Sequence, residues 1–269
     1  MGMKWLKIGG VVFGALVITA LGIDASDTLS GKGGTLLGQV VSVGGGVCPV
    51  GMVEVSSALS FTCVDKWEVS ASEDCSYKNP ANQTDTLENI NNPECSSDSI
   101  ENAMPWRYIT RDQAEIACAR AGKRLPSAEE WYKAALGTVD DKTSCNIDGN
   151  SPEETGSNQS CVSAAGAEDM IGNVWEWVKD DVIEGSYNGR SLPEEGYVSQ
   201  VDSGGVPTMS ETRANNLFND DYVWSAKTGA YGVMRGGFYG SESDAGIYSF
   251  HAKTVPTMTG TAIGFRCVK

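Results

Sequence analysis

The sequence predicts an α+β protein with two helices, small sheets and much irregular loop, held together by disulfides. Two segments combine a helix-capping signature with a following apolar face, which indicates helices. Eight cysteines follow an apolar N-terminal segment, which is typical of a disulfide-bonded exported chain. Much of the C-terminal half consists of Gly, Ser, Asn and Asp with short apolar islands between them. We expect loops there, held by disulfides, aromatic packing or metal more than by strand ladders.

The N-terminus has the pattern of an export signal. Lys4 and Lys7 precede an uncharged run from Ile8 to Ile23, and the first acidic residue is Asp24. A membrane-spanning helix needs about 20 apolar residues, so the run is short for a span and cleavage is favoured over anchoring. Residues 1–29 are therefore predicted to be a signal peptide or N-terminal anchor, and membrane attachment is expected through this segment alone.

A glycine-rich stretch separates this segment from the rest of the chain. Residues 30–46 (SGKGGTLLGQVVSVGGG) hold few large side chains, which favours a flexible linker. Residues 47–269 are expected to form one globular domain. Its location is predicted to be extracytoplasmic, either secreted or anchored at the cell surface.

The charge of the chain argues against one class of partner. With 20 basic and 35 acidic side chains, the formal net charge is -15. Such a surplus of carboxylates repels nucleic-acid phosphates, so nucleic acid is not expected as a partner. Carboxylates also supply the oxygen ligands that Ca2+ prefers, although a surplus alone is weak evidence for a metal.

Helix boundaries are the clearest local predictions. Residues 110–113 (TRDQ) form a capping box before a helix that Gly122 can end. Residues 127–130 (SAEE) form a second box before a helix that Gly137 can end. Residues 61–69 are rich in β-branched and aromatic side chains and are predicted to form a strand.

The cysteines permit several pairings. Cys75 and Cys95 flank the polar residues 71–101, which we expect to be a surface loop stapled by that pair. Proximity in the sequence also favours Cys48 with Cys63 and Cys145 with Cys161. Connectivity is formally open, since eight cysteines allow 105 pairings.

Three sequence blocks occur in order, namely residues 117–131 (ACARAGKRLPSAEEW), 169–177 (DMIGNVWEW), and 235–237 (RGG) with 263–267 (IGFRC). Together they resemble the formylglycine-generating-enzyme (sulfatase-modifying factor) domain family. The resemblance covers roughly residues 48–269 and implies a variant of the C-type lectin fold. It also implies a disulfide between Cys118 and Cys267.

The second block implies a structural calcium site. Trp175 and Trp177 share one face of an extended segment, with Glu176 opposite. From alternation alone, this segment reads equally as a core strand with an exposed glutamate. In the family, the segment wraps Ca2+, so the resemblance implies a site whose ligands come from Asp169, Gly172, Val174 and Glu176. Asn146, followed by Ile147, resembles the start of a second calcium site of the family.

The same resemblance bears on catalysis. The family's oxidase chemistry uses two cysteines after the Gly-Gly of the third block to bind copper(I), a soft ion suited to thiolates. The corresponding positions fall near Ser241 and Gly246. A related branch binds iron through several histidines, whereas His251 is the only histidine of this chain. We therefore expect a protein without the family's catalytic residues.

The expected function is ligand binding or surface display on this scaffold. Residues 235–267 also resemble the variable segment of retroelement-diversified ligand-binding proteins, with an unidentified protein or glycan as the expected partner. Two alternatives stay open, namely a formylglycine-generating-type oxidase or related enzyme acting on a protein, and a structural envelope component. Ordinary solvated loop residues are the simpler reading of the same segment. The candidate contact residues are Trp224, Tyr239, Ser241, Asp244, Tyr248, Phe250 and His251.

Overall fold

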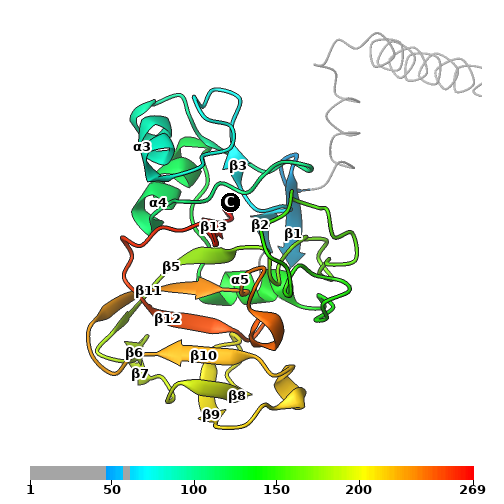
Figure 1. The fold of residues 1–269 in the computed structure, drawn as a ribbon, viewed down its shortest axis with the longest axis vertical. Helices are drawn as coiled ribbons and strands as arrows, with labels where there is room; N and C mark the ends of the chain where they lie inside the picture. The colour runs from blue at the N-terminus through cyan, green and yellow to red at the C-terminus, as the bar shows by residue number, and fades with distance from the viewer. Residues whose placement is uncertain (1–46, 57–60) are drawn as a thin grey trace, which may run out of the picture. The chain divides into compact units, whose positions relative to one another are not determined.

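The structure, a computed structural model, describes residues 47–56 and 61–269 (Figure 1). The predicted signal segment and linker, residues 1–29 and 30–46, lie outside the described residues. Residues 48–269 form one compact unit. Among the described residues, no helix has the length and apolar composition needed to cross a bilayer.

Two helices begin where the sequence predicts. α4 (Arg111–Arg120) starts after Thr110 and α5 (Ala128–Ala135) after Ser127, and both capping boxes form. Each box satisfies backbone N–H groups that have no partner within the first helical turn. Gly122 has a φ of +67°, a left-handed conformation that glycine adopts at little cost just past a helix end.

A third helix, α3 (Gln83–Asn91), lies within the segment predicted to be loop, residues 71–101. The side chain of Asn82 accepts hydrogen bonds from two N–H groups of its first turn. The continuous-loop prediction was wrong because α3 carries almost no apolar face. Instead Asn89 is buried and forms two hydrogen bonds with the backbone of Tyr77, at 2.8 and 2.9 Å.

Nine strands form one sheet in the C-terminal half (Figure 1). Their order is β7-β6-β5-β11-β12-β10-β8-β9, and β13 pairs with β5. The strands are β5 (Trp175–Ile183), β6 (Ser186–Tyr187), β7 (Arg190–Ser191), β8 (Gly196–Val201), β9 (Pro207–Glu211), β10 (Tyr222–Ser225), β11 (Ala230–Arg235), β12 (Phe250–Thr254) and β13 (Ile263–Phe265). The expectation that something other than ladders holds this region was wrong, because short strands find partners far along the chain.

Two smaller sheets complete the described part of the fold. β1 (Met52–Ser56) pairs with β2 (Phe61–Asp65), and β3 (Ser70–Ala71) pairs with β4 (Ser97–Asp98). The strand predicted over residues 61–69 therefore ends early, at Asp65. Together with the three helices, these sheets confirm the predicted α+β class.

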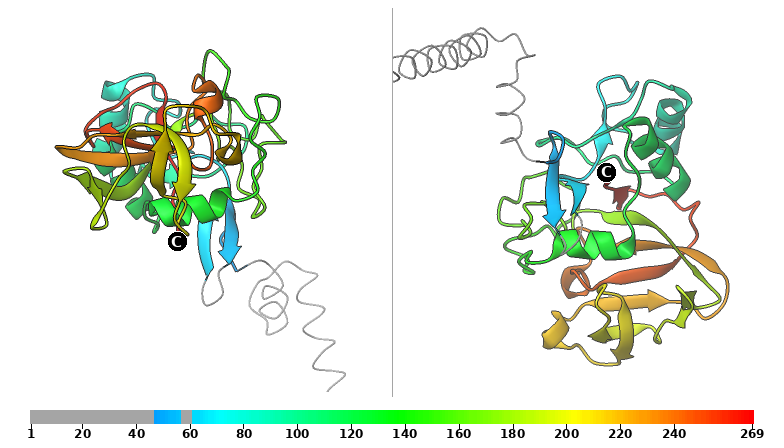
Figure 2. Two further views of the ribbon diagram at one scale, coloured as in Figure 1. Left: turned by 90° about the horizontal axis from the view of Figure 1, so that it is seen from below. Right: turned by 180° about the vertical axis from the view of Figure 1, so that it is seen from behind.

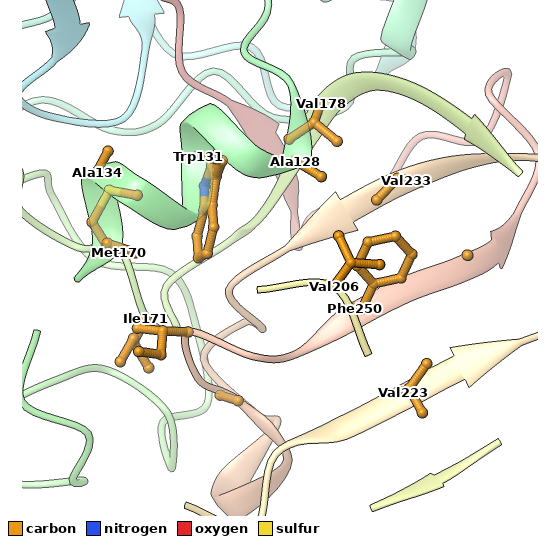
Figure 3. Close-up of a cluster of buried hydrophobic side chains, with 14 of the residues drawn as sticks. Ala128, Trp131, Ala134, Met170, Ile171, Val178, Val206, Val223, Val233 and Phe250 are labelled. Carbon is orange, nitrogen blue, oxygen red and sulfur yellow. The ribbon is translucent and has the colours of Figure 1, made fainter. Parts of the chain in front are cut away.

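The large sheet has a hydrophobic cluster on each face. α5 packs beside β5 and β11 on one face, where Trp131 and Phe250 belong to one buried cluster (Figures 2 and 3). Trp175, Trp177 and Met234 belong to a second cluster. Because successive side chains of a strand point to opposite faces, the strands β5, β10 and β11 contribute side chains to both clusters.

Within the described residues, four disulfides confirm all four predicted pairs. They are Cys48–Cys63, Cys75–Cys95, Cys118–Cys267 and Cys145–Cys161. Three of them close short loops, whereas the Cys118–Cys267 bond joins α4 to the C-terminus across 149 residues. All eight cysteines of the sequence are thus paired.

Candidate functional site

β5 places two tryptophans on one face of the sheet and a glutamate on the other. Trp175 and Trp177 belong to the second cluster, as their spacing predicts. Glu176 points to the face covered by α5, where it is 1% exposed. Its predicted position opposite the tryptophans is therefore confirmed, but α5 buries it completely.

Glu176 forms an ion pair in the protein interior. The guanidinium of Arg266 donates to both carboxylate oxygens, at 2.6 to 2.9 Å, and the indole N–H of Trp131 donates to Oε2 at 2.6 Å. Arg266 also donates to backbone carbonyls of Asp65 and Glu168. This network joins α5, β5 and the residue that directly follows β13 through one buried cation.

The residues predicted to bind calcium gather in one buried region. The carbonyl of Asn146 accepts from the N–H of Asn173 at 2.8 Å, and a Cβ on Gly172 would lie 2.2 Å from that carbonyl oxygen. Asp169 is buried, and Oδ2 accepts from the N–H of Gly156 at 2.7 Å. Burial raises the pKa of Asp169 to about 6.

One of the predicted calcium ligands, Glu176, is engaged by other side chains in this structure. Glu176 would have to leave Arg266 and Trp131 before its carboxylate could bind a metal. Within residues 47–56 and 61–269, no three His, Cys, Asp or Glu side chains are grouped to hold a metal ion. Asp169 and the carbonyls of Gly172 and Val174 stay as the predicted ligands.

Calcium binding stays a prediction. Added calcium should raise the melting temperature, and chelator should reverse the effect, because an ion bound only by the native state stabilises it. Asp169→Asn should abolish the increase, whereas Asp74→Asn, an exposed carboxylate elsewhere, should retain it. A wild-type melting curve that calcium leaves unchanged would contradict the site. Differential scanning fluorimetry measures the melting temperatures of the wild type and of both variants.

A small pocket lies beside the second cluster, with a volume of about 260 Å³. Three of its lining residues come from the sheet, namely Trp175 of β5, Trp224 of β10 and His251 of β12. The other four come from the loop between β11 and β12, which also contains a short 3-10 helix (Glu242–Asp244). These four are Phe238, Gly240, Ser241 and Asp244. The structure thus brings together four of the seven predicted contact residues.

The aromatic rings of the pocket support one another. Trp224 and His251 are register partners on parallel strands, and their rings stack with centroids 5.5 Å apart. Trp175 meets both rings edge-on, at 5.3 and 5.4 Å. Such contacts fix the orientation of aromatic side chains, so the wall of the pocket is held in place before any ligand arrives.

The loop that closes the pocket is also fixed. The N–H of Phe238 donates to the hydroxyl of Ser241 at 3.0 Å, and the N–H of Glu242 donates to the carbonyl of Ile147 at 2.7 Å. Gly237, with a φ of +88°, lies so close to Ala245 that a Cβ would be 2.5 Å from its side chain. A larger residue at this glycine would displace the loop.

The electrostatic character of the pocket is set by one carboxylate. Burial, together with Glu242 and Asp220, raises the pKa of Asp244. Burial lowers the pKa of His251 to about 4, so this imidazole is neutral at pH 7. Within the described residues, Nδ1 of His251 is buried without a hydrogen-bond partner. The described lining residues include no Lys or Arg, so negative charge dominates.

The structure does not bring the other three predicted contact residues to this pocket. Phe250 is fully buried on the α5 face. It precedes His251 in β12, so the two side chains point to opposite faces of the sheet. Tyr248 packs against Tyr132 and Phe218. Tyr239 does not line the pocket, and its ring is edge-on to that of Phe238.

Three lining residues were not among the predicted contacts, namely Trp175, Phe238 and Gly240. Trp175 was predicted only as a buried anchor, and Phe238 follows directly after the Gly-Gly pair without a pattern of its own. Strand alternation gave the face of Trp175 relative to Trp177. The pairing that places Trp224 on the same face has no signal in a single sequence.

The carboxyl group of Asp221 holds the end of the pocket loop, and that of Asp140 lies close to it. Asp221 is fully buried, and its Oδ2 accepts a hydrogen bond from the N–H of Tyr248 at 2.6 Å. Oδ1 of Asp221 and Oδ2 of Asp140 have no hydrogen-bond partner among the described residues. Burial raises the pKa of Asp140 to about 7, and burial together with Asp140 raises that of Asp221 well above its usual value. The neighbours Asp141 and Asp220 raise the pKa of Asp140 further, whereas Arg235 opposes the shift of Asp221.

This pair predicts a pH-dependent stability. The folded protein holds a proton that the unfolded chain releases near pH 4. The contribution of this proton to the free energy of unfolding is therefore complete below pH 4 and is lost as the pH rises through about 7. Asp140→Asn should reduce the loss of unfolding free energy between pH 5 and 8 by on the order of 1 kcal/mol or more. Urea unfolding across that range measures it. An unchanged pH profile in Asp140→Asn, equal to that of Asp74→Asn, would contradict the assignment.

The fold and the pocket together define a disulfide-bonded α+β domain with a fixed, aromatic surface pocket. Residues 50–269 match the family described as the sulfatase-modifying factor enzyme 1-like domain. The chain belongs to this family, which confirms the resemblance seen in its motifs.

Similar proteins were found among curated sequences and solved structures. The hercynine oxygenase of Mycobacterium tuberculosis is 29% identical over 154 residues, which cover 51% of this chain and 30% of the relative. Less than a third of that relative's length is therefore matched. Treponema denticola variable protein 1 is 14% identical with a TM-score of 0.45, covering 82% of this chain and 91% of that protein. The Major Tropism Determinant U1 variant is 16% identical with a TM-score of 0.46, covering 82% and 53%.

Proposed function

We propose that this protein is a non-catalytic, extracytoplasmic ligand-binding protein that uses the aromatic pocket for recognition. The observation that carries the proposal is the convergence of Trp175, Trp224 and Phe238 on one small cavity with a single carboxylate, Asp244. Aromatic side chains bring large contact areas with few rotatable bonds, and a fixed wall reduces the entropy lost on binding.

The construction of the pocket supports binding more than a structural role. A purely structural face would gain stability by covering Trp224 and Phe238, yet both rings stay partly exposed at the cavity. The buried, unpartnered Nδ1 of His251 also costs stability. Four disulfides are typical of an oxidising compartment outside the cytoplasm, which supports the proposed location.

The proposed function predicts a small group of residues that dominate binding. We expect a glycan array and a library of extracellular proteins to yield a partner that wild-type protein retains. Trp224→Ala should weaken that binding by about 2 kcal/mol, the typical cost of truncating an anchoring aromatic residue. Tyr77→Ala, which removes an exposed aromatic ring remote in sequence from the pocket, should bind like the wild type.

Folding must be separated from recognition in this experiment. Trp224 is partly buried, so its removal also costs stability, and Phe238→Ala provides a second variant from the loop side of the pocket. Thermal unfolding identifies variants that remain folded. If folded Trp224→Ala and Phe238→Ala both bind the partner like the wild type, recognition occurs elsewhere on the protein.

A second candidate is an oxygen-dependent enzyme, favoured by the sequence similarity to hercynine oxygenases. That candidate predicts oxidation of a cysteine peptide, or sulfur oxidation on a small substrate, by protein supplied with copper or iron. Oxygen consumption that depends on both substrate and metal would establish it. The ligand-binding proposal predicts no oxygen consumption above the rate measured with the metal alone. If neither binding nor oxidation is found, the third alternative, a structural envelope component, is favoured.

A further inference from the structure

The pocket combines aromatic walls with a negative potential. Trp224 and Phe238 present partly exposed rings, and Asp244 provides the carboxylate. Glu242 and Asp220 add negative charge close to Asp244, as their effect on its pKa shows. The nearest basic group on β12, Lys253, is already paired with Glu195 at 2.7 Å. A cation entering the pocket would therefore meet negative charge that no ion pair among the described residues compensates.

This combination selects among ligand chemistries. Anions are disfavoured by Asp244, and the whole chain, at -15, repels them as well. A hard metal ion prefers several oxygen ligands, whereas aromatic rings and one carboxylate dominate this lining. An organic cation fits both features, because the face of an aromatic ring attracts positive charge and its apolar body covers the alkyl groups.

The dimensions of the pocket limit the ligand further. Pockets that enclose drug-sized molecules typically measure about 300–1,000 Å³. At about 260 Å³, this pocket holds a terminal group more readily than a whole extended ligand. An ammonium group at the end of an alkyl chain has the required size and charge.

We propose that the pocket formed by Trp175, Trp224, Phe238 and Asp244 binds an organic ammonium group, with the rings around the alkylated nitrogen and the carboxylate of Asp244 as its counterion. This inference rests on the proposed function and names its ligand class. The same chemistry occurs in the side chain of lysine and in methylated ammonium headgroups such as choline.

Isothermal titration of the purified protein tests the role of charge directly. The probes are choline and 3,3-dimethylbutan-1-ol, which has nearly the same shape but no charge. Choline should bind at least roughly tenfold more tightly than the alcohol, in line with a desolvated cation–π contact. Butylammonium, which represents the end of a lysine side chain, distinguishes the two sources by its affinity relative to choline.

Matched variants assign the effect to the pocket. Asp244→Asn should reduce the affinity for choline by roughly tenfold and leave that for the alcohol unchanged, because only the charge interaction is lost. Ser243→Ala, an exposed neighbour on the same 3-10 helix, should behave like the wild type. Trp224→Ala should weaken the binding of both probes, and Phe238→Ala serves as the second variant if that protein is unstable.

Two results would overturn the inference. One is equal affinity for choline and its uncharged isostere, and the other is the absence of binding by both choline and butylammonium at tens of millimolar. Neither result decides the proposed function. That function still stands if a glycan or protein partner is retained by the wild type and lost from Trp224→Ala, and it falls if no partner shows this loss.

Discussion

Replacing Arg266 with alanine is expected to lower the free energy of unfolding by about 3–5 kcal/mol, the usual cost of leaving a buried charge without its partner. Arg266 and Glu176 are 0% and 1% exposed, so the ion pair is shielded from bulk solvent. The carboxyl groups of Glu68 and Asp169 lie near enough that each affects the same network. Their repulsion adds to the cost once the cation is gone.

A double-mutant cycle separates the ion pair from the loss of packing. Glu176→Gln alone should also destabilise the protein, but the variant with both changes should be more stable than the sum predicts. The control is Lys133→Ala, which breaks the exposed pair with Glu129 and should cost less than about 1 kcal/mol. Chemical denaturation gives all four values. Additive effects at Glu176 and Arg266 would contradict the coupling.

Removing the Cys118–Cys267 disulfide should have the second large effect. Replacing both cysteines with alanine opens a loop of 149 residues, and the chain-entropy description gives a loss of about 5 kcal/mol for such a loop. Both sulfurs are buried between α4 and the C-terminus. Unfolding should therefore begin with separation of this helix from the sheet.

The Cys145–Cys161 pair provides the matched control, since it also links buried cysteines but is separated by 16 residues. Its double alanine variant should lose about 3 kcal/mol on the same basis. Urea unfolding under non-reducing conditions compares the two. A larger loss for the short loop than for the long one would show that packing, and not loop length, governs the contribution of these bonds.

Local signals in the sequence were sufficient for several elements. The capping boxes at Thr110 and Ser127 define helix starts because a helix end needs hydrogen-bond partners that its own turn lacks. Cysteine spacing indicated three disulfides, and the family motifs indicated the fourth. The alternation of Trp175 and Trp177 around Glu176 defined which side chains share a face, since that depends on the strand alone.

The tertiary structure decided which partners those faces meet. Glu176 looked like an exposed or metal-binding carboxylate, but α5 and β13 bring Trp131 and Arg266 to it from distant parts of the chain. Phe250 and His251 are adjacent in the sequence, yet one enters the core and the other lines the pocket, because the pairing of β12 with β10 and β11 fixes their orientation. The sequence by itself determined the fold class, two of the three described helices and the family. The pocket and the buried ion pair depend on contacts between residues far apart in sequence, and such contacts form only when the whole sheet has assembled.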